Sequence, residues 1–474
     1  MRVSIAVVGG GISGLSTAYF LKRNAAVSSA DIKCIVIDGA KRLGGRIQTE
    51  LVDGLVVEAG PDSFLALKPN AVELCKQLGL SESLIGSNAS KSKIYILHSG
   101  KLRPLPEGMA SSIPTKVMPF LSNSLFTPWG KARMLMDIFI PSRIADGDES
   151  LAEFTRRRLG REALERVAKP LMAGIYAGDA ERLSVRSNFP QLERLEREHR
   201  SLILGTLADR RRNNGTNAGK GSAFMSLRGG LSVMVSALES KLDGEGTSIL
   251  KGSPAVRINA RRGKSGGYSI GLHNGKKLNV DVLVLATPAY VSADLLSSLS
   301  PDAPSILNGI PYASSATVSL AYNRPDLPQG LDGSGFLVAP SERVSITACT
   351  WVSSKWPSHS PDDKVMLRCF IGRAGADDVV KRGDSEIFSM VKEDLRSILS
   401  ISAEPVMERV YRHERALPQY NIGHMERMAL LNAAMEKLPG IYLTGSAYNG
   451  VGIPDCIRHG ELTAAKVLES LAGQ

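Results

Sequence analysis

Apolar and polar residues follow a regular order at the start of the chain. An unbroken apolar run over Val3–Val8 predicts a buried strand, and residues 16–23 carry apolar side chains at helical spacing. The glycine-rich turn Gly9–Gly14 separates the two. A second apolar run, residues 34–37, ends on Asp38. Strand, glycine turn, helix and strand in this order predict a βαβ unit.

The middle of the chain changes character. Residues 101–143 are punctuated by proline and contain methionine, phenylalanine and scattered lysine and arginine. Helical patterns follow at 150–171 and 186–207. A polar, glycine-rich stretch at 210–221 then predicts an exposed loop.

The second half of the chain contains both helical and strand-like patterns of apolar residues. Residues 232–242 predict a helix and residues 282–286 a buried strand. From 300 to 420, short β-rich runs alternate with polar turns, which indicates an α+β region with a mixed sheet. A last strand at 441–444 leads through glycines into a helix that ends near Leu471.

Composition and length indicate an ordinary globular protein of more than one domain. The chain has 474 residues, of which 43% are hydrophobic and 22% charged. This length exceeds what one compact core usually holds, so we expect two or three domains. The five cysteines form no Cys-x-x-Cys pair and no metal-ligand spacing, which favours free thiols in a reducing compartment.

The net charge of +11 indicates that the surface attracts anions such as acidic lipids or carboxylate-bearing substrates. A basic surface without a specific partner is the alternative. No zinc-ligand spacing, helix-turn-helix pattern or aromatic RNA-binding signature favours nucleic acid as a partner. No apolar run approaches the ~18 residues that a membrane span needs. The opening strand leaves no room for a targeting peptide. We therefore expect a cytoplasmic protein, with peripheral contact to the inner face of the cell membrane as a further expectation.

The glycine turn has the spacing of a dinucleotide-binding loop. Gly9 permits the tight turn, Gly11 lets the backbone approach a pyrophosphate, and Gly14 lets the helix pack on the strand. The helix N-terminus then offers free N–H groups to the phosphates. Asp38 is placed to accept hydrogen bonds from the adenosine ribose. The remaining residues of the predicted loop are Gly10, Ile12 and Ser13. An ordinary structural turn and a strand-end acid are the alternatives.

Further motifs resemble one family. The pattern Arg-x-Gly-Gly-Arg at residues 42–46 resembles the amine oxidase and protoporphyrinogen oxidase superfamily, and residues 58–63 fall where those enzymes run backbone along a flavin. The resemblance implies non-covalently bound FAD. It also implies a backbone contact to adenine at Val256 and a helix N-terminus at the isoalloxazine ring, whose dipole favours a reduced flavin. The implied cofactor residues are Gly45, Arg46, Gly60, Pro61, Asp62, Ser63, Val256, Val451, Gly452 and Ile453.

Two segments resemble the porphyrinogen branch of that superfamily. Residues 170–179 resemble a stretch lining a tetrapyrrole pocket, where the small Gly174 and Ala177 would leave room for a large flat ring. A tight helix-to-loop passage is the alternative. Residues 417–424 are also typical of the branch, although the His424 within them is more often a structural hydrogen bonder than a catalyst. His413 departs from the pattern, because relatives often carry tryptophan there.

The resemblance implies a reaction. The substrate would be protoporphyrinogen IX or coproporphyrinogen III, which loses six hydrogens in three flavin cycles, by hydride transfer to FAD, in haem biosynthesis. The sequence has no second dinucleotide unit, iron–sulfur spacing or haem motif, so O2 or a quinone would reoxidise the flavin. No triad, metal cluster or carboxylate pair identifies a catalytic acid or base. Lys93 and Arg103 are candidates for binding the propionates, with solvated surface charge as the alternative.

The expected architecture is α/β with three parts, and the oligomeric state stays open. It has a Rossmann-like FAD-binding domain built from discontinuous segments, an α+β substrate domain with a mixed sheet, and a helical domain. The helical domain faces a membrane or contains a plain pair of core helices. The predicted segments are 1–85, 222–295 and 425–474 for FAD, 86–108 and 296–424 for substrate, and 109–221 for the helical domain.

Two rival interpretations remain. One is an amine or carotenoid oxidoreductase of the same superfamily. Amine oxidases frame the flavin with paired aromatic residues, whereas only Tyr448 lies near the C-terminal flavin segment here. The other is a non-enzymatic escort protein that shares the fold and handles prenylated GTPases. Such a protein has little reason to keep the diphosphate arginines.

Overall fold

The computed structural model describes residues 2–28, 30–110, 113–114, 116–143, 147–213, 222–261, 266–328 and 331–472. The loop predicted at 210–221 begins inside helix α10 (Leu202–Asn213), and its remaining residues, 214–221, lie outside the described chain. Among the described residues, no helix combines the length and the apolar character needed to cross a membrane.

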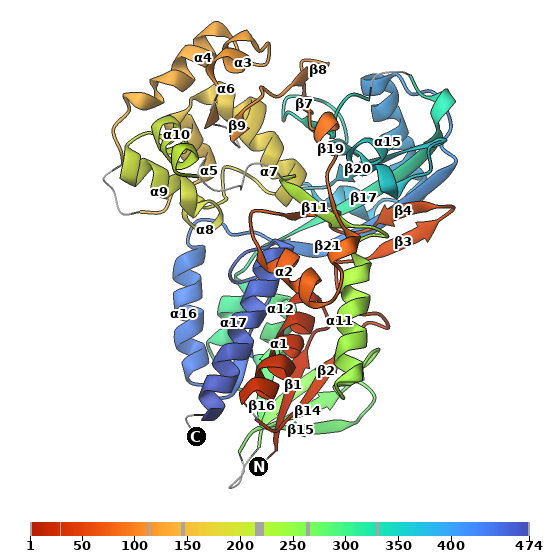
Figure 1. Cartoon of the computed structure of the whole chain (residues 1–474). Coiled ribbons are helices and arrows are strands. Elements are labelled where there is room, and N and C mark those ends of the chain that lie inside the picture. The colour runs from red at the N-terminus through yellow and green to blue at the C-terminus, as the bar shows by residue number, and fades with distance from the viewer. Residues whose placement is uncertain are drawn as a thin grey trace.

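A parallel sheet forms the lower half of the molecule (Figure 1). Its central strand β1 pairs with β2 on one side and with the distant β16 on the other. The apolar runs that predict these strands are buried on both faces, as parallel strands usually are. The five described strands, in spatial order, are β12 (Ser248–Leu250), β2 (Ile32–Ile37), β1 (Val3–Val8), β16 (Val282–Leu285) and β22 (Ile441–Leu443).

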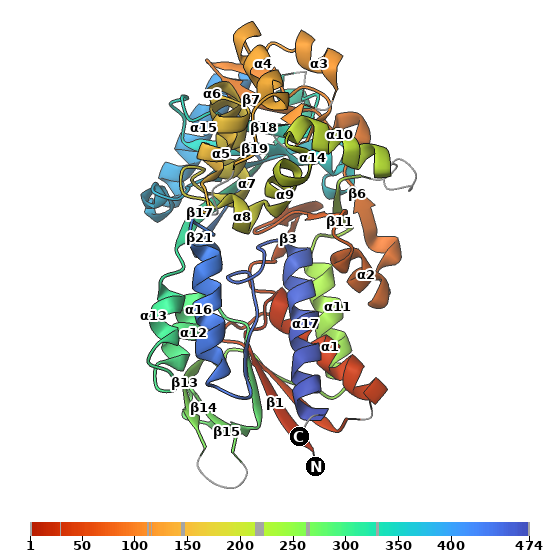
Figure 2. The same cartoon turned by 90° about the vertical axis from the view of Figure 1, so that its left-hand side faces the viewer.

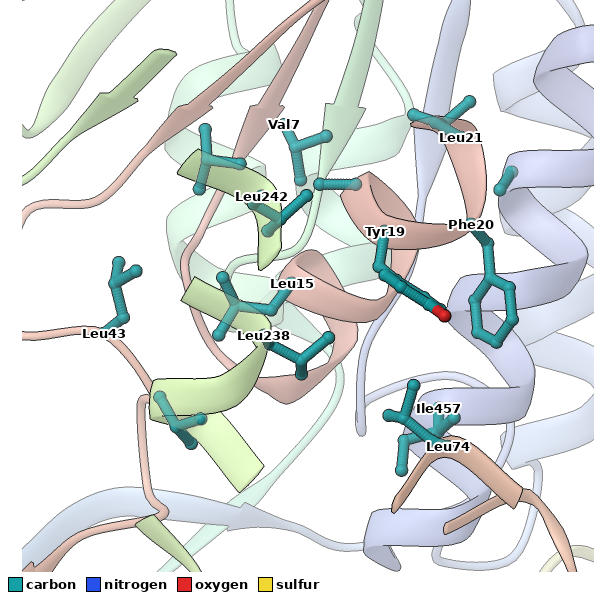
Figure 3. Close-up of a cluster of buried hydrophobic side chains, with 14 of the residues drawn as sticks. Val7, Leu15, Tyr19, Phe20, Leu21, Leu43, Leu74, Leu238, Leu242 and Ile457 are labelled. Carbon is teal, nitrogen blue, oxygen red and sulfur yellow. The ribbon is translucent and has the colours of Figure 1, made fainter. Parts of the chain in front are cut away.

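Helices from both ends of the chain cover one face of this sheet. Helix α1 (Ile12–Ser28) lies against α11 (Ser232–Gly244) and along the C-terminal α17 (Ile453–Ala472). Figure 3 shows part of their shared core, with Leu15 on α1, Leu238 on α11 and Ile457 on α17. The predicted βαβ unit and final helix are therefore confirmed, and the first helix is longer than predicted.

The opposite face is covered by a small antiparallel sheet and further helices (Figure 2). Their apolar side chains form a second core with β16 and β22. The elements are β13 (Ala255–Ala260), β14 (Tyr268–Leu272), β15 (Lys277–Val280), α12 (Ala289–Leu296), α13 (Ala303–Asn308) and α16 (His424–Glu436).

A mixed sheet lies above the parallel one, as the 300–420 pattern predicts. Its strands are antiparallel except for the parallel pair β18 and β7. Helix α15 (Asp384–Leu399) packs on one face through apolar contacts, and the other face is turned toward the cavity described below. The described strands run in the order β21 (Met407–Pro418), β17 (Tyr312–Asn323), β20 (Lys364–Ile371), β19 (Ile346–Trp351), β18 (Gly335–Val338), β7 (Ile94–His98) and β8 (Lys101–Pro104).

Small elements connect the two sheets. A hairpin and a short helix lead from the parallel sheet toward the mixed one (Figure 1). They are β3 (Thr49–Val52), β4 (Leu55–Glu58), β5 (Phe64–Leu65), α2 (Asn70–Gln77), β6 (Leu84–Gly86) and β11 (Phe224–Leu227), of which β5, β11 and β6 form one small sheet.

The helical part breaks where the sequence analysis predicted continuous helices. Gly160 (φ +88°) interrupts the first predicted helix, which resumes at Arg161, and Arg200 (φ +63°) interrupts the second. Ser150 and Glu153 form a capping box that starts α5. The helices are α3 (Val117–Ser122), α4 (Pro128–Leu135), α5 (Leu151–Arg158), α6 (Arg161–Ala163), a π-helix (Leu164–Ala168), α7 (Lys169–Tyr176), α8 (Val185–Asn188), α9 (Pro190–His199) and α10.

One buried ion pair organises this helical part. Arg158 and Asp137 are both fully buried, and the Arg158 Nε donates to the Asp137 carboxylate at 2.7 Å. Arg158 also donates to the Arg200 carbonyl at 2.9 Å, and Asp137 accepts from Ser201 at 2.6 Å. The pair therefore joins α5 to the turn between α9 and α10.

Removing Asp137 should be costly, because it leaves the buried Arg158 charge with only the more distant Glu196 carboxylate, at 3.4 Å, to compensate it. We expect Asp137→Ala to lower the free energy of unfolding by about 3–5 kcal/mol. Urea denaturation followed by circular dichroism measures the change. The control is Asp209→Ala, which removes the partly exposed pair with Arg194 and should cost no more than about 1 kcal/mol. Equal effects would contradict the organising role.

Candidate functional site

A large cavity lies between the parallel sheet, the mixed sheet and the helical part. Its volume is about 2210 Å³. Drug-sized ligands typically occupy pockets of about 300–1,000 Å³, so this cavity has room for a long cofactor together with a sizeable substrate. Its walls combine the glycine turn, the Arg46 bend, the mixed sheet and α7.

The glycine turn has the geometry that a pyrophosphate site needs. Gly9 has φ +110°, and a Cβ at Gly14 would lie 1.9 Å from the Gly9 carbonyl oxygen. At Gly11 the space is open, and a Cβ would meet its nearest atom, Gly45 Cα, at 3.9 Å. The Leu15 N–H donates to the Gly11 carbonyl at 2.9 Å. The N–H groups before it belong to the first turn of α1, where helices offer donors to anions.

Asp38 lies beside this turn at the end of β2. Its carboxylate accepts from the Gly10 N–H at 2.5 Å and from the Ala40 N–H at 2.6 Å. Each carboxylate oxygen keeps a further lone pair. Asp38 therefore shapes the loop and can still accept a hydrogen bond from a ribose, as the sequence predicts.

The bend at residues 42–46 packs on the glycine turn. Gly44 and Gly45 have φ of +99° and +59°, and the Gly44 N–H donates to the Gly10 carbonyl at 2.8 Å. Arg42 donates to the Gly45 carbonyl at 2.8 Å, so it holds the bend itself. Arg46 is exposed and lines the cavity. Of the two arginines, Arg46 is the one placed to pair with a diphosphate.

The segment Gly60–Ser63 runs along the cavity wall, as the sequence predicts. A Cβ at Gly60 would lie 1.8 Å from the Arg46 carbonyl oxygen, so this position requires glycine. Asp62 pairs with Lys355 at 3.0 Å. Burial alone would raise the pKa of Asp62, but the Lys355 ammonium and the Arg368 guanidinium outweigh it and hold the pKa well below its usual range.

Side chains of the mixed sheet donate hydrogen bonds to the backbone carbonyls of Ala59 and Gly60, where this segment begins. Thr317 Oγ1 and His413 Nε2 each donate to the Ala59 carbonyl at 2.8 Å, and Arg368 donates to the Gly60 carbonyl. Burial lowers the pKa of His413, which keeps its ring neutral with the proton on Nε2. His413, which stands where relatives often carry tryptophan, is also one of the residues that line the cavity.

Sequence reasoning missed Thr317, Lys355 and Arg368, although all three line the cavity. Arg368 offered a signal. It is a charged residue inside the apolar run 365–371, where a buried cation requires a reason. Lys355 and Thr317 carried no comparable signal, because their partners are distant in sequence.

The C-terminal segment also lines the cavity, through Val451, Gly452 and Ile453. Tyr420 positions this segment, because its hydroxyl donates to the Ser446 carbonyl at 2.6 Å and accepts from the Gly450 N–H at 2.8 Å. Helix α17 begins at Ile453, so its N-terminus faces the cavity as predicted.

His424 stacks on the Tyr420 ring at 3.9 Å between centroids. Burial lowers the pKa of His424 to about 4, so the ring is neutral at physiological pH. Its Nε2 lies 3.4 Å from the Tyr448 carbonyl. These contacts agree with the structural role that the sequence analysis favoured.

The predicted tetrapyrrole segment lies on the cavity wall, but Gly174 serves another purpose as well. A Cβ there would lie 2.6 Å from Leu337 Cδ2 and 3.1 Å from Ala348 Cβ. The Cβ direction at Gly174 is therefore occupied by the sheet, and glycine lets α7 pack on β18 and β19 while this position still lines the cavity. Ala177 is buried with φ +46° and ends α7 at the cavity.

Three further candidates lie away from the cavity wall. The Val256 side chain is 55% exposed, although its neighbour Ala255 lines the cavity. Lys93 pairs with Asp332 at 2.7 Å, and Arg103 donates to the Ser124 carbonyl at 3.1 Å. Neither basic residue is among those that line the cavity, so the alternative of surface charge describes them better.

The sequence is similar over its whole length to flavin-containing oxidoreductases. The sequence profile of the family described as "Flavin containing amine oxidoreductase" matches residues 12–468. The coproporphyrinogen III oxidase of Bacillus subtilis (strain 168) is 38% identical over 98% of this chain and 98% of its own length. The protoporphyrinogen oxidase of Bos taurus is 31% identical over 99% of both chains.

Solved structures show the same architecture. A crystal structure from Exiguobacterium sp. 255-15 has a TM-score of 0.86 at 32% identity and covers 99% of both chains. Reduced UDP-galactopyranose mutase has a TM-score of 0.72 at 15% identity, which shows a shared fold alone.

The residues fit the cofactor of such proteins. Open backbone at Gly11, donors at the start of α1 and the cation of Arg46 suit a diphosphate, and the cavity extends from there to α17. The expected cofactor, non-covalent FAD, and the three-part fold are thus confirmed. By its whole length and by the geometry of its cavity, this chain belongs to the flavin-containing amine oxidoreductase family.

Proposed function

We propose that this protein oxidises a porphyrinogen to the porphyrin, with coproporphyrinogen III favoured and protoporphyrinogen IX as the second substrate. Full-length similarity carries the proposal, because the relatives at 38%, 34% and 33% identity are all named coproporphyrinogen III oxidase. Putrescine oxidase, by comparison, is 16% identical. An amine substrate is therefore less favoured than a porphyrinogen.

The size and the apolar lining of the cavity favour a large flat substrate. Beyond the residues that suit FAD, its wall is mainly apolar, which excludes water from the reacting carbon. FAD, when bound, supplies the hydride acceptor. The chain's own part is then to hold the ring in one orientation. The residues of this apolar wall are Leu171, Met172, Ile175, Leu337, Ala348 and Phe370.

Two arginines that line the cavity are candidates for binding the propionates. Arg186 lines the cavity and pairs with Glu193 at 2.9 Å, and Arg458 also lines it. Guanidinium groups can bind carboxylates through two parallel hydrogen bonds. We propose these arginines in place of Lys93 and Arg103.

We propose O2 as the acceptor that reoxidises the flavin. The absence of a second dinucleotide turn in the sequence supports a small diffusing acceptor, and a quinone is the other outcome of the test. No side chain is proposed as a catalytic acid or base, because formation of the aromatic ring supplies the driving force.

We also propose that the helical part touches an anionic membrane, and that the protein is otherwise cytoplasmic. Large apolar side chains between residues 118 and 139 are exposed, among them Trp129 (85%), Phe139 (78%) and Met118 (73%). Lys131 lies in the same stretch and Lys116 directly precedes it, which suits an interface with acidic lipid. Phe120 and Met134 are buried, so the stretch also contributes to the core, the alternative considered from the sequence.

Anaerobic mixing tests the substrate. Coproporphyrinogen III should bleach the flavin absorbance faster than protoporphyrinogen IX, and admission of O2 should restore it with growth of porphyrin fluorescence. Reduction by amines but by neither porphyrinogen would overturn the proposal. Recovery with a quinone but not with O2 would overturn the choice of acceptor.

Glycine substitutions test the cofactor site. Gly60→Ala should abolish stoichiometric FAD binding, because its Cβ would meet the Arg46 backbone at 1.8 Å. Gly244→Ala is the matched control, since a Cβ there meets nothing within 4 Å. The flavin-to-protein absorbance ratio of the purified proteins gives the readout. A yellow, fully loaded Gly60→Ala protein would contradict the assignment.

Vesicle sedimentation tests the membrane proposal. The protein should bind vesicles rich in phosphatidylglycerol, and about 1 M salt should weaken the electrostatic part by screening it. Trp129→Ser combined with Phe139→Ser should reduce binding at least tenfold. Leu51→Ser, which removes an equally exposed apolar side chain elsewhere, should not. Equal loss in both variants would contradict the proposed surface.

A further inference from the structure

Three neighbouring strands of the mixed sheet converge on one short piece of backbone. Thr317 on β17 and His413 on β21 both donate to the Ala59 carbonyl at 2.8 Å, and Arg368 on β20 donates to the Gly60 carbonyl. The strands lie side by side in the order β21, β17, β20. We call these three side chains the carbonyl clamp.

The clamp sets the orientation of a peptide group. In a trans peptide the C=O and the following N–H point in opposite directions. Because the Ala59 carbonyl is held against the sheet, the Gly60 N–H is directed away from the sheet. Among the described residues, no hydrogen bond occupies this N–H. Because the following residue, Pro61, has no N–H, the Gly60 N–H is the free backbone donor at the start of this cavity-lining segment.

Burial of the charged Arg368 side chain costs free energy that packing alone does not explain. Its side chain is 3% exposed, its Nε is buried without a partner, and its guanidinium lies 4.7 Å from the Phe370 ring centroid. A buried cation costs several kcal/mol unless charges or hydrogen bonds compensate it. Asp62 and Glu58 act on it through space, but Asp62 is already paired with Lys355.

We propose that the carbonyl clamp consists of positioning residues for the flavin. It fixes the Ala59–Gly60 peptide so that the Gly60 N–H is presented to the bound cofactor. The Arg368 guanidinium, fixed behind that peptide, favours the negative charge of the reduced flavin. The inference rests on the FAD of the family and is independent of the porphyrinogen proposed above.

The reduction potential of the bound flavin tests the charge. Arg368→Met should make reduction of the flavin at least tenfold less favourable, which is about 30 mV for a two-electron couple. Arg368→Lys keeps the charge and should stay within threefold of the wild-type protein. Arg412→Met is the control, because Arg412 is a cation on strand β21 of the same sheet but donates to the Val380 carbonyl, which is not part of the segment that lines the cavity. Dithionite titration with reference dyes gives the potential without any porphyrinogen.

The FAD dissociation constant tests the peptide orientation. His413→Phe removes a donor, whereas His413→Gln can keep one, so the first should weaken FAD binding at least tenfold and the second should remain near wild type. Thr317→Val should add to the loss in His413→Phe. This pair leaves Arg368 in place and decides the matter even where Arg368→Met fails to fold. Equal affinity of the two His413 variants, or an unchanged potential in Arg368→Met, would overturn the proposal.

Discussion

The whole site depends on backbone segments that approach one another more closely than a Cβ would allow. Gly14 lies against the Gly9 carbonyl, and Gly60 lies against the Arg46 carbonyl, with Cβ distances of 1.9 and 1.8 Å if either were alanine. Gly11 and Gly44 form a bridge between the turn and the bend. Real Cβ contacts of this length do not occur, so the glycines are what brings the turn, the bend and the wall segment together around one cavity.

Charge is arranged around this glycine framework on both sides. On the side of the parallel sheet, Arg46 and the start of α1 present positive groups to a diphosphate. On the side of the mixed sheet, Lys355 and Arg368 surround Asp62 and hold its pKa low. The wall segment Gly60–Ser63 links these two groups of charges, because it packs on the Arg46 backbone and carries Asp62.

The sequence predicted the features that are local and missed those that depend on distant contacts. The glycine turn, Asp38, four strands of the parallel sheet (β1, β2, β16 and β22) and the mixed sheet within 300–420 follow from apolar period and turn chemistry within a few residues, whereas β12, β7 and β8 were not predicted. The role of Arg368 depends on the Gly60 carbonyl, which is far away in sequence, and the packing of Gly174 on Leu337 depends on another sheet. The helical part was predicted as too continuous, because Gly160 and Arg200 adopt positive φ inside the predicted helices. Gly160 caps α5 through N–H bonds to the Thr155 and Arg156 carbonyls, a local signal that the apolar period does not contain, whereas the Arg200 carbonyl is held by the distant Arg158.

Helix α17 has a consequence for how the molecule is made. It packs along α1, and Gly460 sits so close to Ser13 that a Cβ would meet the Ser13 carbonyl oxygen at 2.9 Å. β22, which precedes α17, completes the parallel sheet beside β16. During synthesis, the side of α1 that packs on α17 therefore stays uncovered until α17 itself has been made.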